Sequence, residues 1–502
     1  MELTDLERQR IEKLERLQSG GVEAYPNRVS RTHPIAEAIT AFKKAEEGDE
    51  EPPSVAVTGR LRSIRTMGKI SFADVEDGTG SIQLFLRVDE LDDQVYENFK
   101  ENFDLGDFVA AQGPLMRTRT GEISVLPQHL RMISKAISPL PVIKEKEVDG
   151  RTVRYTSFSD VEERYRQRYA DLASNPDVRQ IFRRRARTIR AMRDFLDRHD
   201  FLEVETPILQ PIYGGAAARP FVTHHQQLHQ DLYLRISFEL YLKRLLVGML
   251  DRVYEIGRDF RNEGVSHKHN PEFTQMEFYA AYWDYHDVMD FCERMVAYIA
   301  EEVTGSPTIH YQGNDIDLSP PWRRVTLRDI AREVTGIDYQ QYPTAEELAE
   351  AMRAEDLPTP SGATWGHLID KGLLGTVEPT LIQPTFVMDY PRDISPLAKT
   401  KPDDPTHVER FEFFIGGLEM GNAFTELNDP FDQEERFLEM GRLYDADDEE
   451  AHPMDEDYIR AIKYGMPPNG GFGIGVDRLV MLLTDQPNIR EVILFPHLRE
   501  KE

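Results

Sequence analysis

Cysteine is almost absent from this sequence, since Cys292 is the only one among 502 residues. An intrachain disulfide and a zinc site built from several cysteines are therefore excluded. Long apolar runs are also missing: no stretch approaches the ~18 apolar residues of a membrane-spanning helix. The first residues, MELTDLERQR, are charged and lack the apolar segment of a secretory signal. We therefore expect a cytoplasmic protein that does not enter a membrane.

Basic charge is scarce, because 60 Lys and Arg stand against 89 Asp and Glu and leave a formal charge of −29. Such a chain cannot attract nucleic acid through its overall charge, so RNA or DNA binding would need a local basic surface. The hydrophobic fraction of 40% is that of an ordinary globular protein. At about 150 residues per domain, the length predicts about three domains.

The patterns along the chain divide it into four parts. Residues 1–52 predict an N-terminal helical extension, and residues 53–137 predict three short strands, a helix and two further strands. That order is typical of an OB-fold barrel. Residues 138–160 resemble a linker with a small hairpin around its Asp149-Gly150 turn. Residues 161–502 form one long α+β region.

One face of the predicted barrel carries residues suited to single-stranded nucleic acid. Phe72 could stack on a base and Gln83 could read its edge. A basic patch lies on or beside that face, at Arg60, Arg62, Arg65 and Lys69. The alternative interpretation places Phe72 in the core and the charges in solvent, and the barrel pattern alone favours this alternative.

Three segments of the α+β region contain more polar residues than a core needs. In the first, YLRISFELYLKRLL, a strand leads into a helix that Ser237 can cap, with Glu239 in the first turn. A carboxylate there suits the helix dipole, which by itself explains Glu239.

The second segment, residues 253–282, predicts a strand, a loop and a returning strand. Strand parity places an aromatic ring, an amide, a carboxylate and a phenol on one face, at Phe273, Gln275, Glu277 and Tyr279. The other face is apolar and suits a core. The polar face is therefore either exposed to solvent or part of a pocket, with Arg261 beside it.

The third segment, residues 410–430, places Asn422, Phe424 and Glu426 on one face of a strand after two carboxylates, Glu412 and Glu419. Carboxylates that converge in an apolar stretch repel unless a cation joins them. A hard divalent ion such as Mg²⁺ is the natural partner, and it usually also binds phosphate.

A glycine-rich strand and turn, GFGIGVDR at 471–478, runs into an apolar helix with Arg478 in its first turn. Glycines allow a flat ligand to approach the backbone, although this pattern alone is weak evidence. Together with Arg261 it suggests two arginines that grip a polyphosphate.

These motifs, taken in order, resemble the class II lysyl-tRNA synthetases. The resemblance rests on FLEVETPIL around Pro207, GGAAARPF, ELYLKR, FRNEG, HNPEFTQMEFY, LIQPTF, SPLAK, GNAFTELND and GFGIGVDR, and it covers nearly the whole chain. It implies an antiparallel catalytic sheet flanked by helices, preceded by the OB-fold domain and an N-terminal helix. It also implies a homodimer with the Pro207 segment at the interface.

The resemblance implies that L-lysine attacks ATP to give lysyl-adenylate and pyrophosphate, and that tRNA(Lys) then receives the lysyl group. Arg261 and Arg478 are the implied catalytic residues, at the α- and γ-phosphates. An ATP site is implied at Arg261, His269, Asn270, Phe273, Glu412 and Arg478, with Mg²⁺ held by Glu412 and Glu419.

The lysine and anticodon sites also follow from the resemblance. The lysine site is implied at Gly215, Glu239, Arg261, Glu277, Tyr279, Asn422, Phe424, Glu426 and Gly473. Anticodon contacts are implied at Phe72, Gln83 and Glu122, and DNA is not an expected partner.

Two alternatives remain at this point. An RNA-binding protein with an inactive synthetase-like domain would lack a phosphate-binding arginine or a metal-binding carboxylate, and none is missing. A protein-lysylating enzyme would lack the anticodon domain, which this chain has.

Overall fold

A computed structural model describes residues 3–141, 143–148, 151–156, 160–443 and 453–500. The chain divides into two compact units, Met1–Ser159 and Asp160–Glu502. The turn predicted at Asp149-Gly150 lies outside the described residues. Its two flanking strands, β7 (Ile143–Val148) and β8 (Arg151–Thr156), pair as the expected antiparallel hairpin.

The first unit contains a barrel in which the sheet order is β1-β2-β3-β5-β4-β6. The long first strand pairs with β4 through residues 54–60 and with β2 through residues 60–67, and this double pairing closes the barrel. The expected OB-fold is confirmed, with one additional three-residue strand. The elements are β1 (Ser54–Met67), β2 (Ile70–Glu76), β3 (Ser81–Arg87), α3 (Asp93–Asn102), β4 (Phe108–Arg117), β5 (Ile123–Val125) and β6 (His129–Ser134).

Alternation along β2 decides where Phe72 lies. Ser71, Ala73 and Val75 are buried, whereas Phe72 and Asp74 are only partly buried and occupy the opposite face of the strand. The interpretation of Phe72 as a core residue is therefore wrong. Its ring is on the outer face of the barrel.

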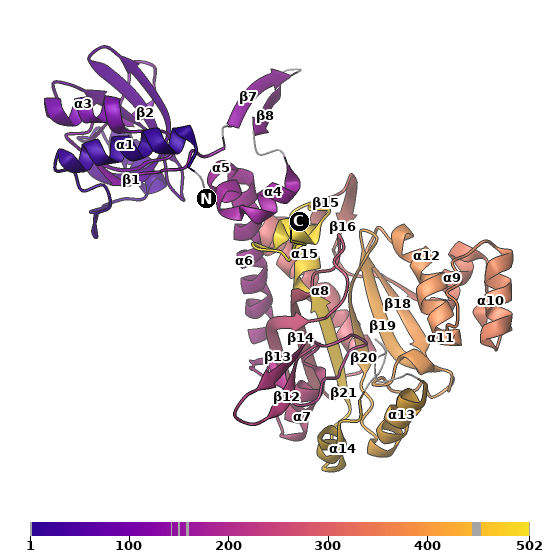
Figure 1. The fold of residues 1–502 in the computed structure, drawn as a ribbon. Coiled ribbons are helices and arrows are strands. Elements are labelled where there is room, and N and C mark those ends of the chain that lie inside the picture. Colours follow the sequence, from indigo (N-terminus) through magenta and orange to yellow (C-terminus); the bar gives the residue numbers. More distant parts are fainter. Residues whose placement is uncertain (1–2, 142, 149–150, 157–159, 444–452, 501–502) are drawn as a thin grey trace. The chain divides into compact units, whose positions relative to one another are not determined.

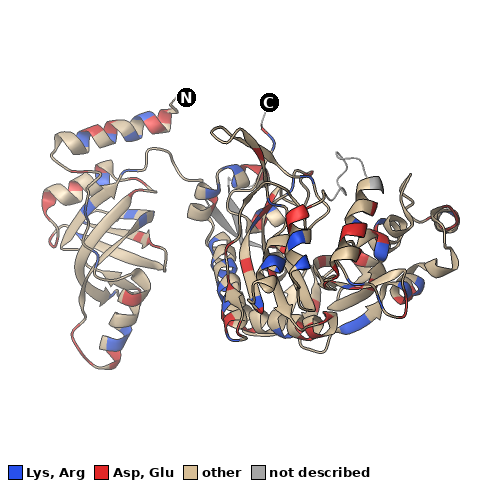
Figure 2. Cartoon of the chain, turned by 90° about the horizontal axis from the view of Figure 1, so that it is seen from below, with Lys and Arg blue, Asp and Glu red and all other residues tan. Residues whose placement is uncertain are grey.

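Two helices precede the barrel, α1 (Asp5–Ser19) and α2 (Ile35–Glu47). A capping box between Thr4 and Glu7 starts α1, along which acidic and basic residues alternate (Figure 2). Leu17 of α1 and Phe42 of α2 are buried in the same apolar cluster as the barrel strands. The extension and the barrel thus share one core.

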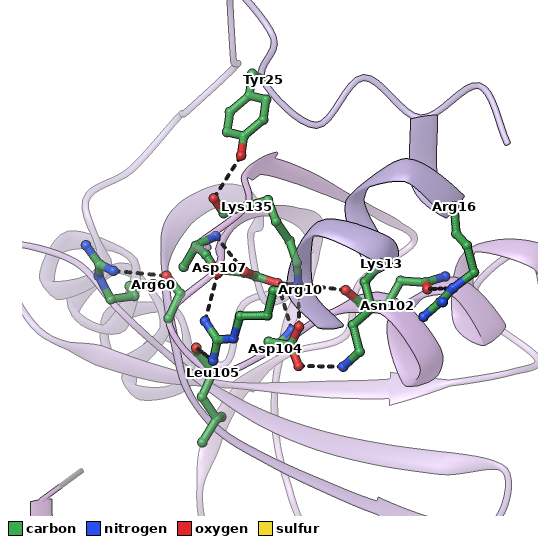
Figure 3. Close-up of polar contacts among 12 residues, drawn as sticks. Arg10, Lys13, Arg16, Tyr25, Arg60, Asn102, Asp104, Leu105, Asp107 and Lys135 are labelled. Carbon is green, nitrogen blue, oxygen red and sulfur yellow. Dashed lines mark hydrogen bonds and ion pairs between the residues drawn. The ribbon is translucent and has the colours of Figure 1, made fainter. Parts of the chain in front are cut away.

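A polar network ties α1 to the barrel (Figure 3). The ammonium of Lys135, whose side chain is fully buried, donates to the Asn102 carbonyl at 2.8 Å, to Asp104 at 2.6 Å and to Asp107 at 2.8 Å. Lys13 of α1 donates to the second oxygen of Asp104 at 2.6 Å. All three protons of the buried ammonium therefore have acceptors, as a buried charge requires.

The second unit is built on an eight-stranded sheet in the order β17-β18-β19-β20-β21-β14-β13-β9. Its centre is antiparallel, and only the outermost pairs, β17 with β18 and β13 with β9, are parallel. The strands are β9 (Leu202–Glu203), β13 (Arg252–Phe260), β14 (Glu272–Ala281), β17 (Arg323–Thr326), β18 (Thr385–Pro391), β19 (His407–Ile415), β20 (Leu418–Thr425) and β21 (Asn469–Gly475).

Helices α6 (Pro176–Asp197), α8 (Tyr285–Thr304) and α15 (Val476–Leu483) pack over one face of this sheet (Figure 1). That face contributes Met276 and Phe278 to the main core. Helix α7 (Glu239–Val247) packs against Tyr279 on the other face. The sheet with flanking helices that we expected is confirmed.

The other elements surround this framework, and helices α9 to α12 gather beside β18 (Figure 1). The other helices are α4 (Val161–Arg166), α5 (Arg168–Ser174), α9 (Leu327–Thr335), α10 (Ala345–Ala354), α11 (Trp365–His367), α12 (Gly375–Val377), α13 (Pro430–Leu443), α14 (Glu456–Lys463) and α16 (Ile489–Val492). Short strands are β10 (Leu209–Gln210), β11 (Val222–His225), β12 (Gln230–Leu234), β15 (Thr308–Tyr311) and β16 (Asn314–Asp317). Single turns are η1 (Tyr339–Gln341), η3 (Glu378–Thr380) and η4 (Arg392–Ile394), and η2 (Leu368–Leu374) is π-helical.

None of the helices in the described parts of the chain combines the length and apolar character needed to cross a membrane.

Candidate active site

Two adjoining cavities lie on the polar face of the catalytic sheet. The larger has a volume of about 380 Å³ and the smaller about 170 Å³. Both are lined by Ala217, Arg261, Gln275, Asn422 and Gly473. A guest in one cavity would therefore meet a guest in the other beside Arg261 and Asn422.

The smaller cavity is lined by three buried carboxylates, Glu239, Glu277 and Glu426, whose exposed fractions are 4%, 3% and 0%. Every residue that the resemblance implies for lysine lines this cavity. A glycine is required at 471, since a Cβ there would lie 2.1 Å from Glu426 Oε1 and 2.4 Å from the Tyr279 ring. The glycine strand thus allows the carboxylate and the phenol to approach the backbone.

Glu277 is held by three side-chain donors. Ser237 Oγ donates at 2.8 Å and Gln275 Nε2 at 3.0 Å to Oε1, while the Tyr279 hydroxyl donates at 3.2 Å to Oε2. Ser237 lies just before α7. Gln275 and Tyr279 lie on the same face of β14 as Glu277, as strand parity predicts. The expectation for the helix cap is wrong by one residue, because Phe238 is the N-cap of α7. Ser237 Oγ still accepts from the Glu239 amide at 3.1 Å.

Burial makes the charged forms of these carboxylates costly. It raises the pKa of Glu277 well above its usual range, and Asp259 and Glu239 raise it further. Burial also raises the pKa of Glu426 to about 8, although the Lys243 ammonium acts in the opposite direction. A cationic guest would relieve this cost, since buried carboxylates need a compensating charge.

Several buried polar atoms around the cavities have no hydrogen-bond partner among the described residues. They are Oε1 of Glu426 and the Nε atoms of Arg261 and Arg410, and all three residues line the cavities. Buried polar groups are nearly always bonded, so a cluster of exceptions indicates a place where a polar ligand binds.

The larger cavity brings together the cationic residues expected for phosphates. The Arg261 guanidinium lies 5.1 Å from the centre of the Phe273 ring, and Arg478 contacts Glu419 at 3.3 Å and His269 Nε2 at 3.2 Å. Burial, together with Arg478 and Lys268, lowers the pKa of His269 to about 4. His269 is therefore neutral near pH 7 and adds no charge of its own.

Asn270 lines the larger cavity, but its amide is engaged within the chain. Its Nδ2 donates to the Glu272 carbonyl at 2.6 Å, and its Oδ1 accepts from the His497 amide at 3.3 Å. The side chain thus fixes the turn into β14.

The two carboxylates expected to hold a metal differ in position. Glu419 lines the larger cavity, whereas Glu412 is buried, lines neither of the two cavities and accepts from Arg410 at 2.6 Å. The pKa of Glu412 is raised to about 7, chiefly by burial, with Arg410 lowering it and Glu419 and Asp370 adding to the rise. Within the described residues no three His, Cys, Asp or Glu side chains gather as a metal site. Two hard oxygen donors that repel each other suit a divalent cation whose other ligands come from a phosphate.

The sequence comparisons agree with this geometry. The profile of the family described as "tRNA synthetases class II (D, K and N)" matches residues 160–499, and that of the "OB-fold nucleic acid binding domain" matches residues 55–133. The chain is 53% identical to a protein named lysine--tRNA ligase from Roseiflexus castenholzii, over 100% of both chains. The chain belongs to the class II lysyl-tRNA synthetases. Similar relatives of the same name are the Chloroflexus aurantiacus protein, 53% identical over 100% of this chain and 99% of its own, and the Moorella thermoacetica protein, 51% identical over 99% and 98%.

Sequence reasoning missed several charged residues of this synthetase's site. Lys268 and Lys371 line the larger cavity, and Lys268 pairs with Glu378 at 2.7 Å. Lys371 lies in the π-helical turn η2, a geometry frequent at functional sites. Arg410 lines the smaller cavity. A lone lysine or arginine gives no periodic signal, so only the fold brings these residues to the site.

Arg185 of α6 supports the site from behind. Its guanidinium donates to Asp477 of α15 and, at 2.9 Å, to Thr274 of β14. It therefore links a helix to the strand that carries the site.

On the barrel of this synthetase, Phe72 and Phe85 form a stacked pair with ring centres 4.9 Å apart. In the neighbouring row, Gln83 pairs with Asp74 across the strands and accepts from Ser124 Oγ at 3.1 Å. Glu122 is exposed just before β5. An aromatic platform beside an amide is thus available on the outer face.

The basic patch expected on this face is smaller than predicted. Arg60 donates to the Gly106 carbonyl at 3.0 Å and covers the Phe108 ring, and Arg62 pairs with Glu76 at 2.9 Å. Arg65 and Lys69 are exposed. Two of the four cations therefore stabilise the barrel itself.

Proposed function

We propose that this enzyme activates L-lysine with ATP, forming lysyl-adenylate and pyrophosphate, and then transfers the lysyl group to the 3′ end of tRNA(Lys). The observation that carries the proposal is the junction of two cavities, one lined by buried carboxylates and one by arginines, at Arg261 and Asn422. The single buried cysteine fits a reducing compartment, so we place the reaction in the cytoplasm.

Adenylation needs no protein nucleophile, because the carboxylate of lysine itself attacks the α-phosphate. The enzyme's task is to align the two substrates and to stabilise the negative charge that develops. Arg261 is proposed to contact both the lysine carboxylate and the α-phosphate, because it lines both cavities. Arg478 is proposed for the γ-phosphate and Phe273 for stacking on adenine, with His269 and Asn270 beside the phosphates.

Glu412 and Glu419 are the residues proposed to hold Mg²⁺. The two carboxylates are hard oxygen ligands, and Glu419 raises the pKa of Glu412 by charge repulsion. When bound, the ion neutralises phosphate charge and draws electrons from the bond that breaks.

The smaller cavity is proposed to select lysine by charge. Glu239 and the Gly215 carbonyl are assigned to the α-ammonium, and Glu277, Tyr279 and Glu426 to the side-chain ammonium. Asn422 is assigned to the carboxylate, with Phe424 and Gly473 forming the walls. A neutral side chain would leave the buried carboxylates unpaired, so the site should reject it strongly.

The barrel is proposed to bind the anticodon, with Phe72 stacking on a base and Gln83 and Glu122 reading its edge. The stacked rings of Phe72 and Phe85 support this assignment. We also propose the division of the chain into an extension (1–52), an anticodon-binding domain (53–137), a linker (138–160) and a catalytic domain (161–502).

A homodimer is proposed through the surface around the Pro207 segment. Large apolar side chains are exposed there, with Leu202 at 50%, Leu209 at 47% and Val222 at 61%. Such a patch on one chain suits burial against a second copy. Sedimentation velocity would show a species of twice the chain mass, and a monomer at micromolar concentration would contradict the assignment.

The reaction is tested by ATP–pyrophosphate exchange with each standard amino acid, followed by charging of tRNA(Lys). Exchange with lysine alone, and lysine-dependent charging, are expected. Exchange with a different amino acid would overturn the pocket assignment. No exchange from folded protein with Mg²⁺ would overturn the activity.

A further inference from the structure

A lysine of the protein lies directly behind the cavity proposed for lysine. Lys243 is on α7, one turn after Glu239, and its side chain is fully buried. Its ammonium contacts Glu239 Oε1 at 2.7 Å and forms a second, shorter ion pair with Glu426 Oε2. One resident cation therefore bridges two of the three carboxylates that line the smaller cavity.

Lys243 does not itself line that cavity, so it would act on a ligand only through its partners. It uses one oxygen of Glu426 and leaves Oε1 without a hydrogen-bond partner in the described structure. That free oxygen faces Gly471 and the Tyr279 ring, which line the cavity. The contact therefore fixes which oxygen of Glu426 is available to a guest.

We propose that Lys243 is a positioning residue for lysine recognition, because its bridge fixes Glu239 and Glu426 in the orientation in which the pocket binds a cation. The inference rests on the proposed function and assigns to this chain a residue that selects the substrate without touching it. A buried lysine is costly unless it is paired, and both ion pairs of Lys243 within the described residues are with carboxylates of the site.

The charged and titratable groups that act on Lys243 and on the carboxylates of the pocket come from five elements. They are Glu239 on α7, Glu277 and Tyr279 on β14, Asp259 on β13, Arg410 on β19 and Tyr458 on α14, besides Glu426 just after β20. Burial raises the pKa of Glu426, and Lys243 is the cation that lowers it. Without Lys243 this pKa rises, and protonated Glu426 cannot bind an ammonium.

Lysine binds the ionised carboxylate, so its Kd falls as the pH rises through the pKa of Glu426, which is about 8. In Lys243→Met the midpoint of this fall should move upward by at least about one pH unit. At a pH below both midpoints, a shift of one unit makes the Kd of the variant about tenfold higher than that of the wild type.

The experiment measures the Kd for L-lysine by calorimetry between pH 6.5 and 8.5, with the Kd for ATP as a second readout. Over this range the wild-type Kd should begin to level off near pH 8, whereas the Lys243→Met Kd should still fall throughout. Lys243→Met is expected to raise the lysine Kd at least about tenfold at pH 7.5 and to leave the ATP Kd unchanged. Lys243→Arg keeps the charge and should retain the wild-type midpoint. Arg244→Met is the matched control. It removes the same charge from the same helix, but Arg244 pairs with Asp455 and not with a carboxylate of the pocket.

A Lys243→Met protein with the wild-type Kd and midpoint would overturn the inference, even if its thermal stability fell. If this variant does not fold, Glu239→Gln is compared with Lys243→Met/Glu239→Gln, which removes the ion pair's two charges together. Only the double variant should show the raised midpoint, and equal midpoints would overturn the inference. A wild-type protein that binds no lysine would instead refute the proposed function.

Discussion

Each unit of this chain buries a lysine among carboxylates, and the two clusters differ in one respect. In the first unit the ammonium of Lys135 has three hydrogen-bond acceptors, one for each of its protons (Figure 3). In the second unit Lys243 bridges Glu239 and Glu426, but Glu426 Oε1 has no hydrogen-bond partner among the described residues and adjoins a cavity. We call the Lys135 cluster closed, because its ammonium is fully hydrogen-bonded, and the Lys243 cluster open, because one of its carboxylate oxygens is not. The closed cluster stabilises the fold, whereas the open cluster can still bind a further cation.

A buried ion pair is therefore not in itself a sign of function. The two clusters differ in that one carboxylate oxygen of the second, Glu426 Oε1, accepts no hydrogen bond within the described residues. Variants that remove charge from each cluster should therefore damage different properties.

The largest effect is expected from breaking the closed cluster. Lys135→Met leaves Asp104 and Asp107 without their shared cation, and Asp107 is fully buried. Removing one partner of a buried pair costs about 3–5 kcal/mol, so the unfolding of the first unit should move to a markedly lower temperature. Calorimetry would measure this shift, and lysine-dependent exchange below that temperature should persist. Lost exchange with unchanged stability would reverse the comparison.

The next effect is expected in the open cluster. Glu426→Gln removes one charge from the proposed ammonium site, and a hydrogen bond to a charged group contributes about 1.5–3 kcal/mol. The KM for lysine should therefore rise about 10- to 100-fold while the KM for ATP stays near its wild-type value. Steady-state exchange measures both constants, with Glu301→Gln, an exposed position on α8, as control. An unchanged lysine KM would refute the assignment.

Phe72→Ala tests whether the first unit acts on tRNA while the second acts on lysine. Loss of one stacking platform costs about 1–3 kcal/mol per base. The KM for tRNA in aminoacylation should rise accordingly, and exchange without tRNA should not change. Equal damage to both reactions would indicate misfolding instead.

The smallest effect is expected from Ser237→Ala. It removes one of the three donors that hold Glu277, and a single hydrogen bond contributes about 0.5–1.5 kcal/mol. Lysine KM should rise by less than about tenfold, with Thr206→Ala, a residue that contacts Glu255 instead, as comparison. A loss as large as that of Glu426→Gln would show that Ser237 itself contacts the substrate.

Periodic features of the site were predictable from the sequence. Strand parity brings Gln275, Glu277 and Tyr279 to one face because side chains alternate along any strand. The same rule allows Phe72 either face, and only the observed register shows that the core takes Ala73 and Val75.

Other features were not predictable, because they depend on contacts between distant segments. Lys243 follows Glu239 by one helical turn, and an ordinary i, i+4 pair on a surface helix would have the same spacing. Its second partner, Glu426, comes from another part of the chain. The fold alone turns a common surface pattern into a buried bridge behind a cavity.

The most direct test of the charge-selective pocket compares the binding of L-lysine and L-norleucine, which share a chain length and differ in the terminal ammonium. Calorimetry with the wild-type protein at pH 7.5 should give measurable binding for lysine and none for norleucine up to millimolar concentration. Comparable Kd values for the two amino acids would contradict selection by Glu277 and Glu426.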